Sequence, residues 1–222
     1  MDLLDILFAR KLDEHGGGSS KLPQVVDKSV TSISASDLAG ATQIGDFAFR
    51  NCTSLVSITI PSSATLIGGQ AFYGCTNLAD VTFQEGVTNI QNDIFFLCIS
   101  LARVSLPNSV TSLGNSVFGD CSALEEVNIP NQITSLPLYL FQNCTSLEEI
   151  DIPASVASIG GYAFNGCTSL ASITVRATTP PTLGANAFNN ISANAKFYVP
   201  SASVDAYKSA WPDFASQIEA IS

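Results

Sequence analysis

Six cysteines are the side chains of this chain whose type and spacing point most directly to chemistry. They recur every 23 residues, at Cys52, Cys75, Cys98, Cys121, Cys144 and Cys167. Thiols bind zinc, form disulfides or pack as small apolar groups. Zinc sites use pairs of cysteines about two to four residues apart, which this spacing excludes. Stacked units would bring neighbouring cysteines within disulfide reach, but side chains that point the same way lack the disulfide twist. The spacing therefore favours a column of buried free thiols, with disulfides as the alternative.

Other catalytic side chains form no recognisable constellation. The only histidine is His15, followed by Gly16-Gly17-Gly18, so the cysteine repeats contain no base for Ser-His-Asp or Cys-His chemistry. Nucleotide-binding and metalloprotease motifs do not occur. Paired carboxylates of the glycosidase kind remain as an alternative, but an open sheet face offers no enclosing pocket. We therefore predict a protein that is not an enzyme and needs no cofactor.

The cysteines belong to a longer repeat that must position them. A phenylalanine precedes each cysteine by three residues, at Phe49, Phe72, Phe95, Phe118, Phe141 and Phe164. A leucine follows each cysteine by three residues, from Leu55 to Leu170. Repeats of this length indicate a solenoid, in which coils stack and like residues form ladders through a shared core. The phenylalanine column is predicted to be an aromatic spine within that core.

Each repeat also predicts a strand. Apolar residues at six and eight positions after the cysteine alternate with polar ones, and a proline such as Pro61 or Pro107 often follows. The strands are expected to run parallel at 57–60, 80–83, 103–106, 126–129, 149–152 and 172–175. A second apolar pair lies 12 and 15 positions after the cysteine. Two repeats depart from the pattern, with Gln91 and Ile94 in one and Pro137 in another, and local bulges are expected there.

The repeat unit resembles the leucine-rich repeat of BspA-like bacterial surface proteins. Leu55-x-x-Ile58-x-Ile60-Pro61 and Ile159-Gly160-x-x-Ala163-Phe164-x-x-Cys167 carry the resemblance, which covers roughly residues 30–200. It implies a curved, right-handed α/β solenoid of the leucine-rich repeat class, used for adhesion or ligand binding. We expect one parallel sheet and about six coils of 23 residues, with a cap at each end.

The chain is predicted to have four sections. Residues 1–21 read as an N-terminal helix followed by a Gly/Ser linker, and 22–43 as an N-terminal cap. The solenoid is assigned to 44–175. A last partial repeat and a C-terminal cap that includes Trp211 occupy 176–222.

The charge of the chain limits its partners. The net charge is −10, and no lysine occurs between Lys28 and Lys196. A nucleic-acid-binding protein needs a basic stripe to neutralise phosphates, so nucleic acid is excluded as a partner. No apolar run approaches the roughly 18 residues of a membrane-spanning helix, and membrane insertion is not expected.

The outward side of the predicted strands is the expected ligand surface, because packing fixes the inward side. Its charged residues are Asp80, Arg103, Glu125, Glu126, Glu148, Glu149 and Asp151. Glu126 is expected beside Glu149, where like charges weaken a sheet. Such a patch suits a basic partner or a cation such as Ca²⁺, although a solvated face that aids solubility is the simpler interpretation. A second candidate is a ridge formed by Tyr73, Phe96, Leu97, Tyr139 and Tyr162.

These observations predict a non-enzymatic binding or adhesion module that recognises a protein or glycan through its strand face. The resemblance implies a cell-surface or extracellular location, although the acidic start of the chain is not that of a secretion signal. The alternative is a structural or host-recognition component of a phage particle. In that alternative, which a short similarity of the first residues to prophage repeat proteins suggests, the N-terminal helix docks onto a partner protein.

Overall fold

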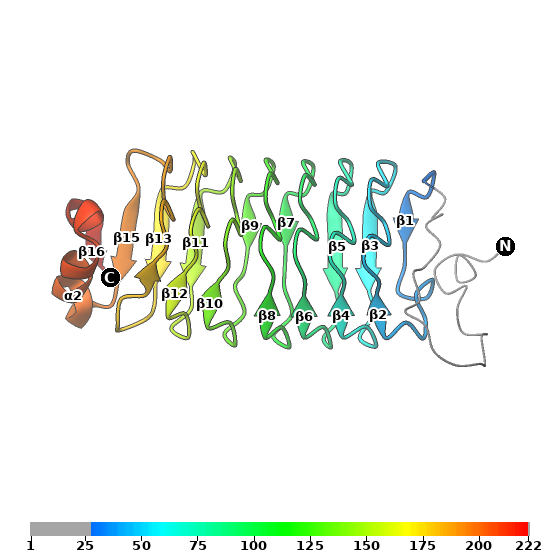
Figure 1. The fold of residues 1–222 in the computed structure, drawn as a ribbon, viewed down its shortest axis with the longest axis horizontal. Coiled ribbons are helices and arrows are strands. Elements are labelled where there is room, and N and C mark those ends of the chain that lie inside the picture. Colours follow the sequence, from blue (N-terminus) through cyan, green and yellow to red (C-terminus); the bar gives the residue numbers. More distant parts are fainter. Residues whose placement is uncertain (1–27, 222) are drawn as a thin grey trace.

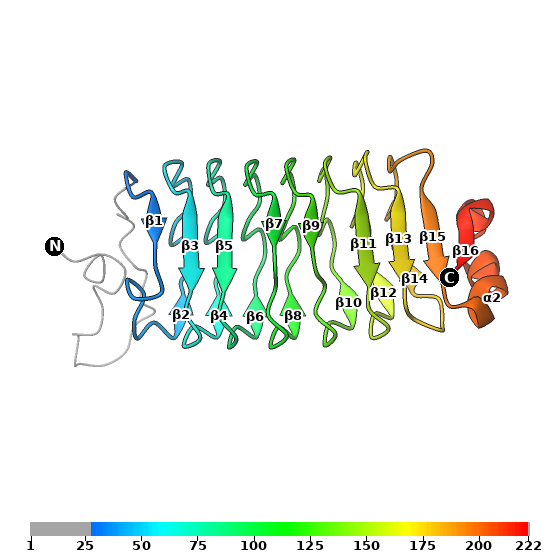
Figure 2. The same cartoon turned by 180° about the vertical axis from the view of Figure 1, so that it is seen from behind.

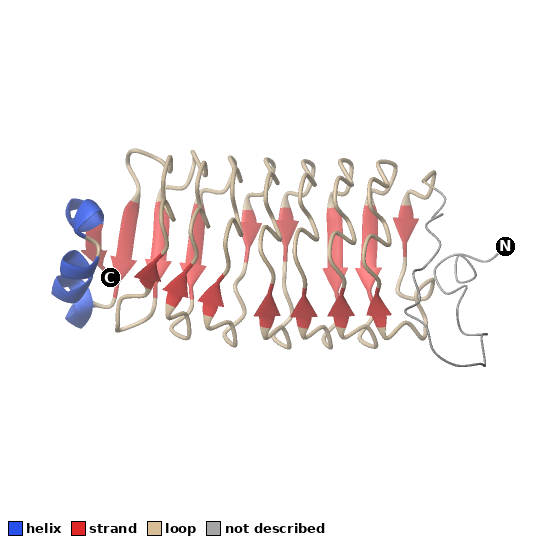
Figure 3. Cartoon of the chain, viewed as in Figure 1, coloured by secondary structure: helices blue, strands red, loops and turns tan. Residues whose placement is uncertain are grey.

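The computed structural model describes residues 28–221 (Figure 1). The predicted N-terminal helix and linker, His15 and the first part of the predicted N-terminal cap lie outside the described residues. Within 28–221, the chain winds into coils that stack side by side along one long axis. Helical segments occur only at the C-terminal end of the described residues (Figure 3).

Each coil contributes one strand to a first row, which we call the strand face. Eight of these strands follow one another along the stack, and β16 closes the row: β1 (Ser32–Ile33), β3 (Ser57–Ile60), β5 (Asp80–Phe83), β7 (Arg103–Val104), β9 (Glu126–Val127), β11 (Glu149–Ile152), β13 (Ser172–Val175), β15 (Lys196–Val199) and β16 (Ile218–Ala220). Every recorded pair in this row is parallel. The predicted solenoid of parallel strands is thus confirmed, with eight coils where about six plus caps were expected.

A second row of two-residue strands runs in the opposite direction (Figure 2). It consists of β2 (Gln43–Ile44), β4 (Leu66–Ile67), β6 (Asn89–Ile90), β8 (Ser112–Leu113), β10 (Ser135–Leu136), β12 (Ser158–Ile159) and β14 (Thr182–Leu183). In the five coils from Cys52 to Cys144, the apolar pair 12 and 15 positions after the cysteine leads into this row, and its second residue ends the strand. The second residue of the pair is buried at Ile67, Ile90, Leu136 and Ile159 and partly buried at Leu113. The single sheet that the repeat predicted is therefore corrected to two rows, each divided into two sheets.

Proline sets the length of the strand pairs on the strand face. The N–H of Gln84 donates to the carbonyl of Ile60 at 3.0 Å, and β3 and β5 pair over four residues. The N–H of Arg176 makes the same bond to Ile152, and β11 and β13 also pair over four residues. Pro107 occupies the equivalent position after β7 and has no N–H to donate. The β5–β7 pair accordingly ends after two residues.

Pro137 interrupts the second row by the same mechanism. At this position of the coil, Gly114 donates its N–H to Ile90 at 2.7 Å, and Gly160 donates to Leu136 at 2.8 Å. Pro137 lies between them and cannot donate to Leu113. The second row is divided there, between β8 and β10. Gln91, the other departure, still donates to Ile67 at 3.0 Å.

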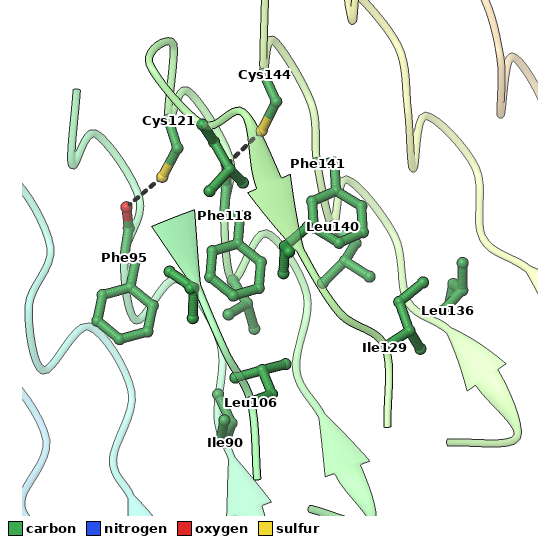
Figure 4. Close-up of a cluster of buried hydrophobic side chains, with 14 of the residues drawn as sticks. Ile90, Phe95, Leu106, Phe118, Cys121, Ile129, Leu136, Leu140, Phe141 and Cys144 are labelled. Carbon is green, nitrogen blue, oxygen red and sulfur yellow. Dashed lines mark hydrogen bonds between the residues drawn. The ribbon is translucent and has the colours of Figure 1, made fainter. Parts of the chain in front are cut away.

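The third side of each coil is a turn that carries the phenylalanine and cysteine columns, and we call it the turn edge. Rings of successive coils, from Phe49 through to Phe188, stack with centroids 5.0 to 5.7 Å apart. Each of the six phenylalanines from Phe49 to Phe164 donates its N–H to a carbonyl of the next coil, as Phe118 does to Leu140 at 3.0 Å. The rings lie beside the aliphatic residues of both strand rows (Figure 4). Together these side chains form one continuous core.

A cap covers the C-terminal end of that core. It comprises η1 (Ser201–Ser203), α2 (Val204–Ala210) and η2 (Pro212–Gln217). Tyr207 donates its hydroxyl to the carbonyl of Ala177 at 2.7 Å, and Trp211 donates its indole N–H to Pro181 at 3.0 Å. Both side chains are buried. Trp211 therefore joins the cap to the last coil and presents no surface to a ligand.

Candidate binding surface

The strand face brings several of the predicted site residues into one row. Asp80 of β5 pairs in register with Arg103 of β7, which in turn pairs with Glu126 of β9. All three side chains are exposed, because alternate residues of each strand point away from the core. A charged strip thus crosses the middle of the solenoid.

Arg103 is the cation at the centre of this strip. Its guanidinium lies 3.6 Å from Glu125 and 3.8 Å from Glu126. The three side chains retain between 58% and 76% of their exposure. Water and salt screen such contacts, so they stabilise the fold little and leave these groups available to a partner.

Asp151 on β11 is engaged more tightly. The Nε atom of Arg176 donates to its Oδ1 at 2.8 Å, and Nη2 donates to its Oδ2 at 2.6 Å. These bonds to Asp151 raise the pKa of Arg176. A similar pair at the cap joins Lys196 to Glu219 at 2.6 Å. Two fork-like bonds hold Asp151 in place, so it is less free than the glutamates to meet a ligand.

Glu148 and Glu149 form no ion pair within residues 28–221. Glu149 is the first residue of β11 and Glu148 directly precedes it. The strand face is divided into two sheets between β9 and β11. Glu126 and Glu149 are therefore not paired across a ladder as the repeat predicted. Two causes favour the division: Pro153 offers no N–H after β11, and like charges destabilise directly opposed positions. Glu125 and Glu126 thus lie on one side of the division and Glu148 and Glu149 on the other. Only the first two have Arg103 as a partner among the described residues.

A hollow of about 290 Å³ opens on the strand face between β5 and the segment after β7. Its lining includes Phe83, Glu85, Ser105 and Pro107. Sequence reasoning missed this feature. The available signal was Phe83 itself, which is the aromatic member of a column otherwise made of aliphatic residues: Ile60, Leu106, Ile129, Ile152 and Val175.

The predicted aromatic ridge consists of two separate stacks. In the first, Arg50 lies 4.7 Å from the ring of Tyr73, which stacks on Phe96 at 5.3 Å. Phe96 covers Gly119, where a Cβ atom would lie 2.7 Å from the ring. In the second, Tyr139 stacks on Tyr162 at 5.2 Å. Leu97, Tyr139 and Tyr162 all have positive φ values, like other residues of these turns.

The thiols lie on the turn edge, away from the strand face. Five of them donate to the carbonyl of a phenylalanine in the preceding coil, as Cys121 does to Phe95 at 3.1 Å and Cys144 to Phe118 at 3.1 Å (Figure 4). Burial raises the pKa of Cys75 and of Cys167 to about 12. Protonated, enclosed thiols are poor nucleophiles and poor metal ligands. Their chemistry in this fold is therefore that of packing.

Residues 28–221 were compared with the geometry of metal sites and of membrane-spanning helices. This part of the chain has no group of three or more histidine, cysteine or carboxylate side chains placed to hold a metal ion. None of its helices is long and apolar enough to cross a membrane.

Comparison with known proteins agrees with this architecture. The model of the BspA type leucine rich repeat region matches in six copies, over residues 26–148 and 134–221. A leucine-rich repeat protein of T. pallidum is 25% identical and superposes with a TM-score of 0.65, over 82% of this chain and 84% of that one. A leucine-rich cell surface protein of Faecalibacterium prausnitzii is also 25% identical, with a TM-score of 0.54. In that comparison, 82% of this chain spans 62% of the larger protein.

No match to a curated protein was found. The family match covers almost all of the described residues, and its unit is the 23-residue repeat that builds the two strand rows and the turn edge. The chain therefore belongs to the family of BspA-type leucine-rich repeat proteins.

Proposed function

We propose that the chain is a non-enzymatic binding module at the bacterial cell surface, and that its strand face holds a protein partner with a basic surface. The cell-surface location follows the description of the F. prausnitzii relative. A scaffold role suits the fold, because a solenoid core is filled by its own repeats and offers an extended outer surface.

The exposed glutamates at the division between β9 and β11 carry this proposal. Glu148 and Glu149 have no cationic partner in the described chain, and Arg103 meets Glu125 and Glu126 only through long, exposed contacts. Nothing in the fold requires the four carboxylates to lie together. A basic partner would relieve their mutual repulsion, and it would be attracted from a distance by the charge of the surface.

The test is the charge-neutralising pair Glu126→Gln with Glu149→Gln. A matched control, Asp205→Asn with Asp213→Asn, removes the same charge from the C-terminal cap. Proteins captured on the immobilised wild-type chain are identified, and the affinity of the strongest is measured for the three forms at low and high salt. We expect the strand-face pair to weaken binding severalfold and to flatten its salt dependence, whereas the cap pair retains wild-type behaviour. Equal affinities for all three forms would reject the acidic patch.

A further inference from the structure

The hollow between β5 and the segment after β7 is a gap in a hydrogen-bond ladder. Pairing of the two strands ends at Val81 and Val104. In a parallel ladder, every second residue of a strand directs its N–H and C=O to the same neighbouring strand. Val81 directs these groups to β7, so Phe83, two residues later, directs its own to residues 105–107. Pro107 lacks the N–H that Gln84 supplies to Ile60 one coil earlier. No backbone hydrogen bond joins Phe83 to this part of the next coil.

The next junction shows how such a gap is closed. Pro130 again removes the donor, but the side chain of Asn128 takes the place of the missing strand. Its Oδ1 accepts the N–H of Leu106 at 2.7 Å, and its Nδ2 donates to the carbonyl of Leu106 at 2.9 Å. Ser105 occupies the position of Asn128 one coil earlier, and its side chain is too short to do the same. The amide and carbonyl of Phe83 are thus left open where those of Leu106 are covered.

Contacts with neighbouring residues fix the side chains that line the hollow. Glu85 accepts the N–H groups of Asn108 and Ser109, both at 3.2 Å, which fixes its carboxylate at the rim. Phe83 is only partly buried, and its ring meets that of Phe95 edge to face, with centroids 6.3 Å apart. The hollow therefore combines a partly buried phenylalanine with a backbone donor, a backbone acceptor, the hydroxyl groups of Thr82 and Ser105, and one carboxylate.

We propose that this hollow binds one unit of a neutral sugar. Sugar hydroxyls both donate and accept, which matches a site that offers an N–H, a C=O, hydroxyls and a carboxylate together. The apolar face of a sugar ring can lie against Phe83, and ligand sites commonly combine apolar walls with a few placed polar groups. The volume of about 290 Å³ is near the lower end of small-molecule sites, about 300–1,000 Å³.

Other ligand classes fit less well. The only charged side chain of the lining is Glu85, so an anionic sugar or a phosphate would meet a like charge. An added peptide strand needs a row of free backbone groups. Here only the groups of Phe83 are open, because Asn128 covers those of Leu106. This site goes beyond the proposed protein surface and does not involve the glutamates of β9 and β11.

Saturation-transfer NMR tests the proposal with a panel of neutral probes: glucose, galactose, mannose, fucose, N-acetylglucosamine and their methyl glycosides at millimolar concentration. The decisive variant is Ser105→Asn, which copies the Asn128 arrangement and should cover the open groups of Phe83. The matched control is Thr59→Asn, in the same column but two coils before Ser105 and outside the lining of the hollow.

We expect at least one probe to bind the wild type and Thr59→Asn equally, and to lose at least tenfold of its affinity for Ser105→Asn. The melting temperature of Ser105→Asn should rise, because the new amide completes the ladder. If that variant folds poorly, Phe83→Leu is measured in its place, and we expect it to show the same loss of the saturation-transfer signal. A panel in which no probe binds the wild type overturns the proposal, as does a signal that survives in the folded variant. Sugar binding should persist in the double variant Glu126→Gln with Glu149→Gln. The sugar site and the proposed protein-binding surface are therefore tested independently.

Discussion

The turn edge and the strand face differ in how their coils are joined. On the turn edge, every junction from Phe49 to Phe188 has a ring stack, and the six phenylalanines of the repeat also donate backbone N–H groups to the next coil. On the strand face, pairing shortens after β5 and stops between β9 and β11. The difference indicates that the buried edge holds the coils in register. The strand face can then vary its side chains and leave backbone groups open without loss of the fold.

High pH should affect the turn edge most. Burial raises the pKa of the thiols above the ordinary value of 9.0, to about 12 for Cys75 and Cys167. The neutral thiol is therefore favoured in the folded state. The stabilisation is complete below pH 9 and is lost as the pH rises from 9 through the folded-state value near 12. We expect cooperative unfolding in this window, followed by circular dichroism.

The control for this prediction is Cys75→Ala, which removes one titrating group from the column. Its melting temperature should be lower at neutral pH but should fall less steeply between pH 9 and pH 12. Identical slopes for the variant and the wild type would show that other groups cause the alkaline transition.

Removal of one ring should be the next largest effect. Phe118 is fully buried, with centroids of Phe95 and Phe141 at 5.7 Å and 5.5 Å. Phe118→Ala should lower the free energy of unfolding by about 3–5 kcal/mol, the range for a buried aromatic truncation. Urea titration measures the change. Thr82→Ala, on the exposed strand face, should shift the midpoint little. A small effect of Phe118→Ala would show that the ring stack does not hold the coils of the turn edge together.

The role of proline predicts a smaller change on the strand face. Gln84→Pro removes the N–H that donates to Ile60 and should shorten the β3–β5 pair to the length of β5–β7. The expected loss is about 1 kcal/mol for one backbone hydrogen bond, measured by urea titration. Gln84→Ala is the control, since the side-chain amide of Gln84 also accepts the N–H of Ser62 at 3.0 Å. If both variants lose the same stability, the backbone bond is not the cause.

Much of the fold was predictable because the repeat fixes the spacing of its columns. The phenylalanine, cysteine and leucine positions repeat without exception, and the strand segments begin where the alternation of Ile58 and Ile60 and its equivalents places them. The second strand row corresponds to an apolar pair in the sequence, but strands of two residues are too short to show the alternation that marks a strand. Pro137 did mark a departure, which the structure shows to be a division of that row.

The site was harder to predict, because its features arise between coils. The hollow depends on three residues of one junction: Pro107 lacks a donor, Ser105 is short and Phe83 is large. The following junction has the same proline but closes through Asn128. Comparison of equivalent positions along the repeat, one position at a time, does not show how the residues of one junction act together. The charges of the strand face could be read from the sequence, whereas the pairing of Asp151 with Arg176 needed the structure.

Native-state hydrogen exchange, followed amide by amide on the full chain, tests most directly whether the turn edge holds the coils together. We expect the amides of Phe95, Phe118 and Phe141 to exchange slowest, with free energies of opening close to that of global unfolding. Amides of β9 and β11 beside the division should open at lower free energy. Equal protection of both regions, or earlier opening of the phenylalanine amides, would contradict the account.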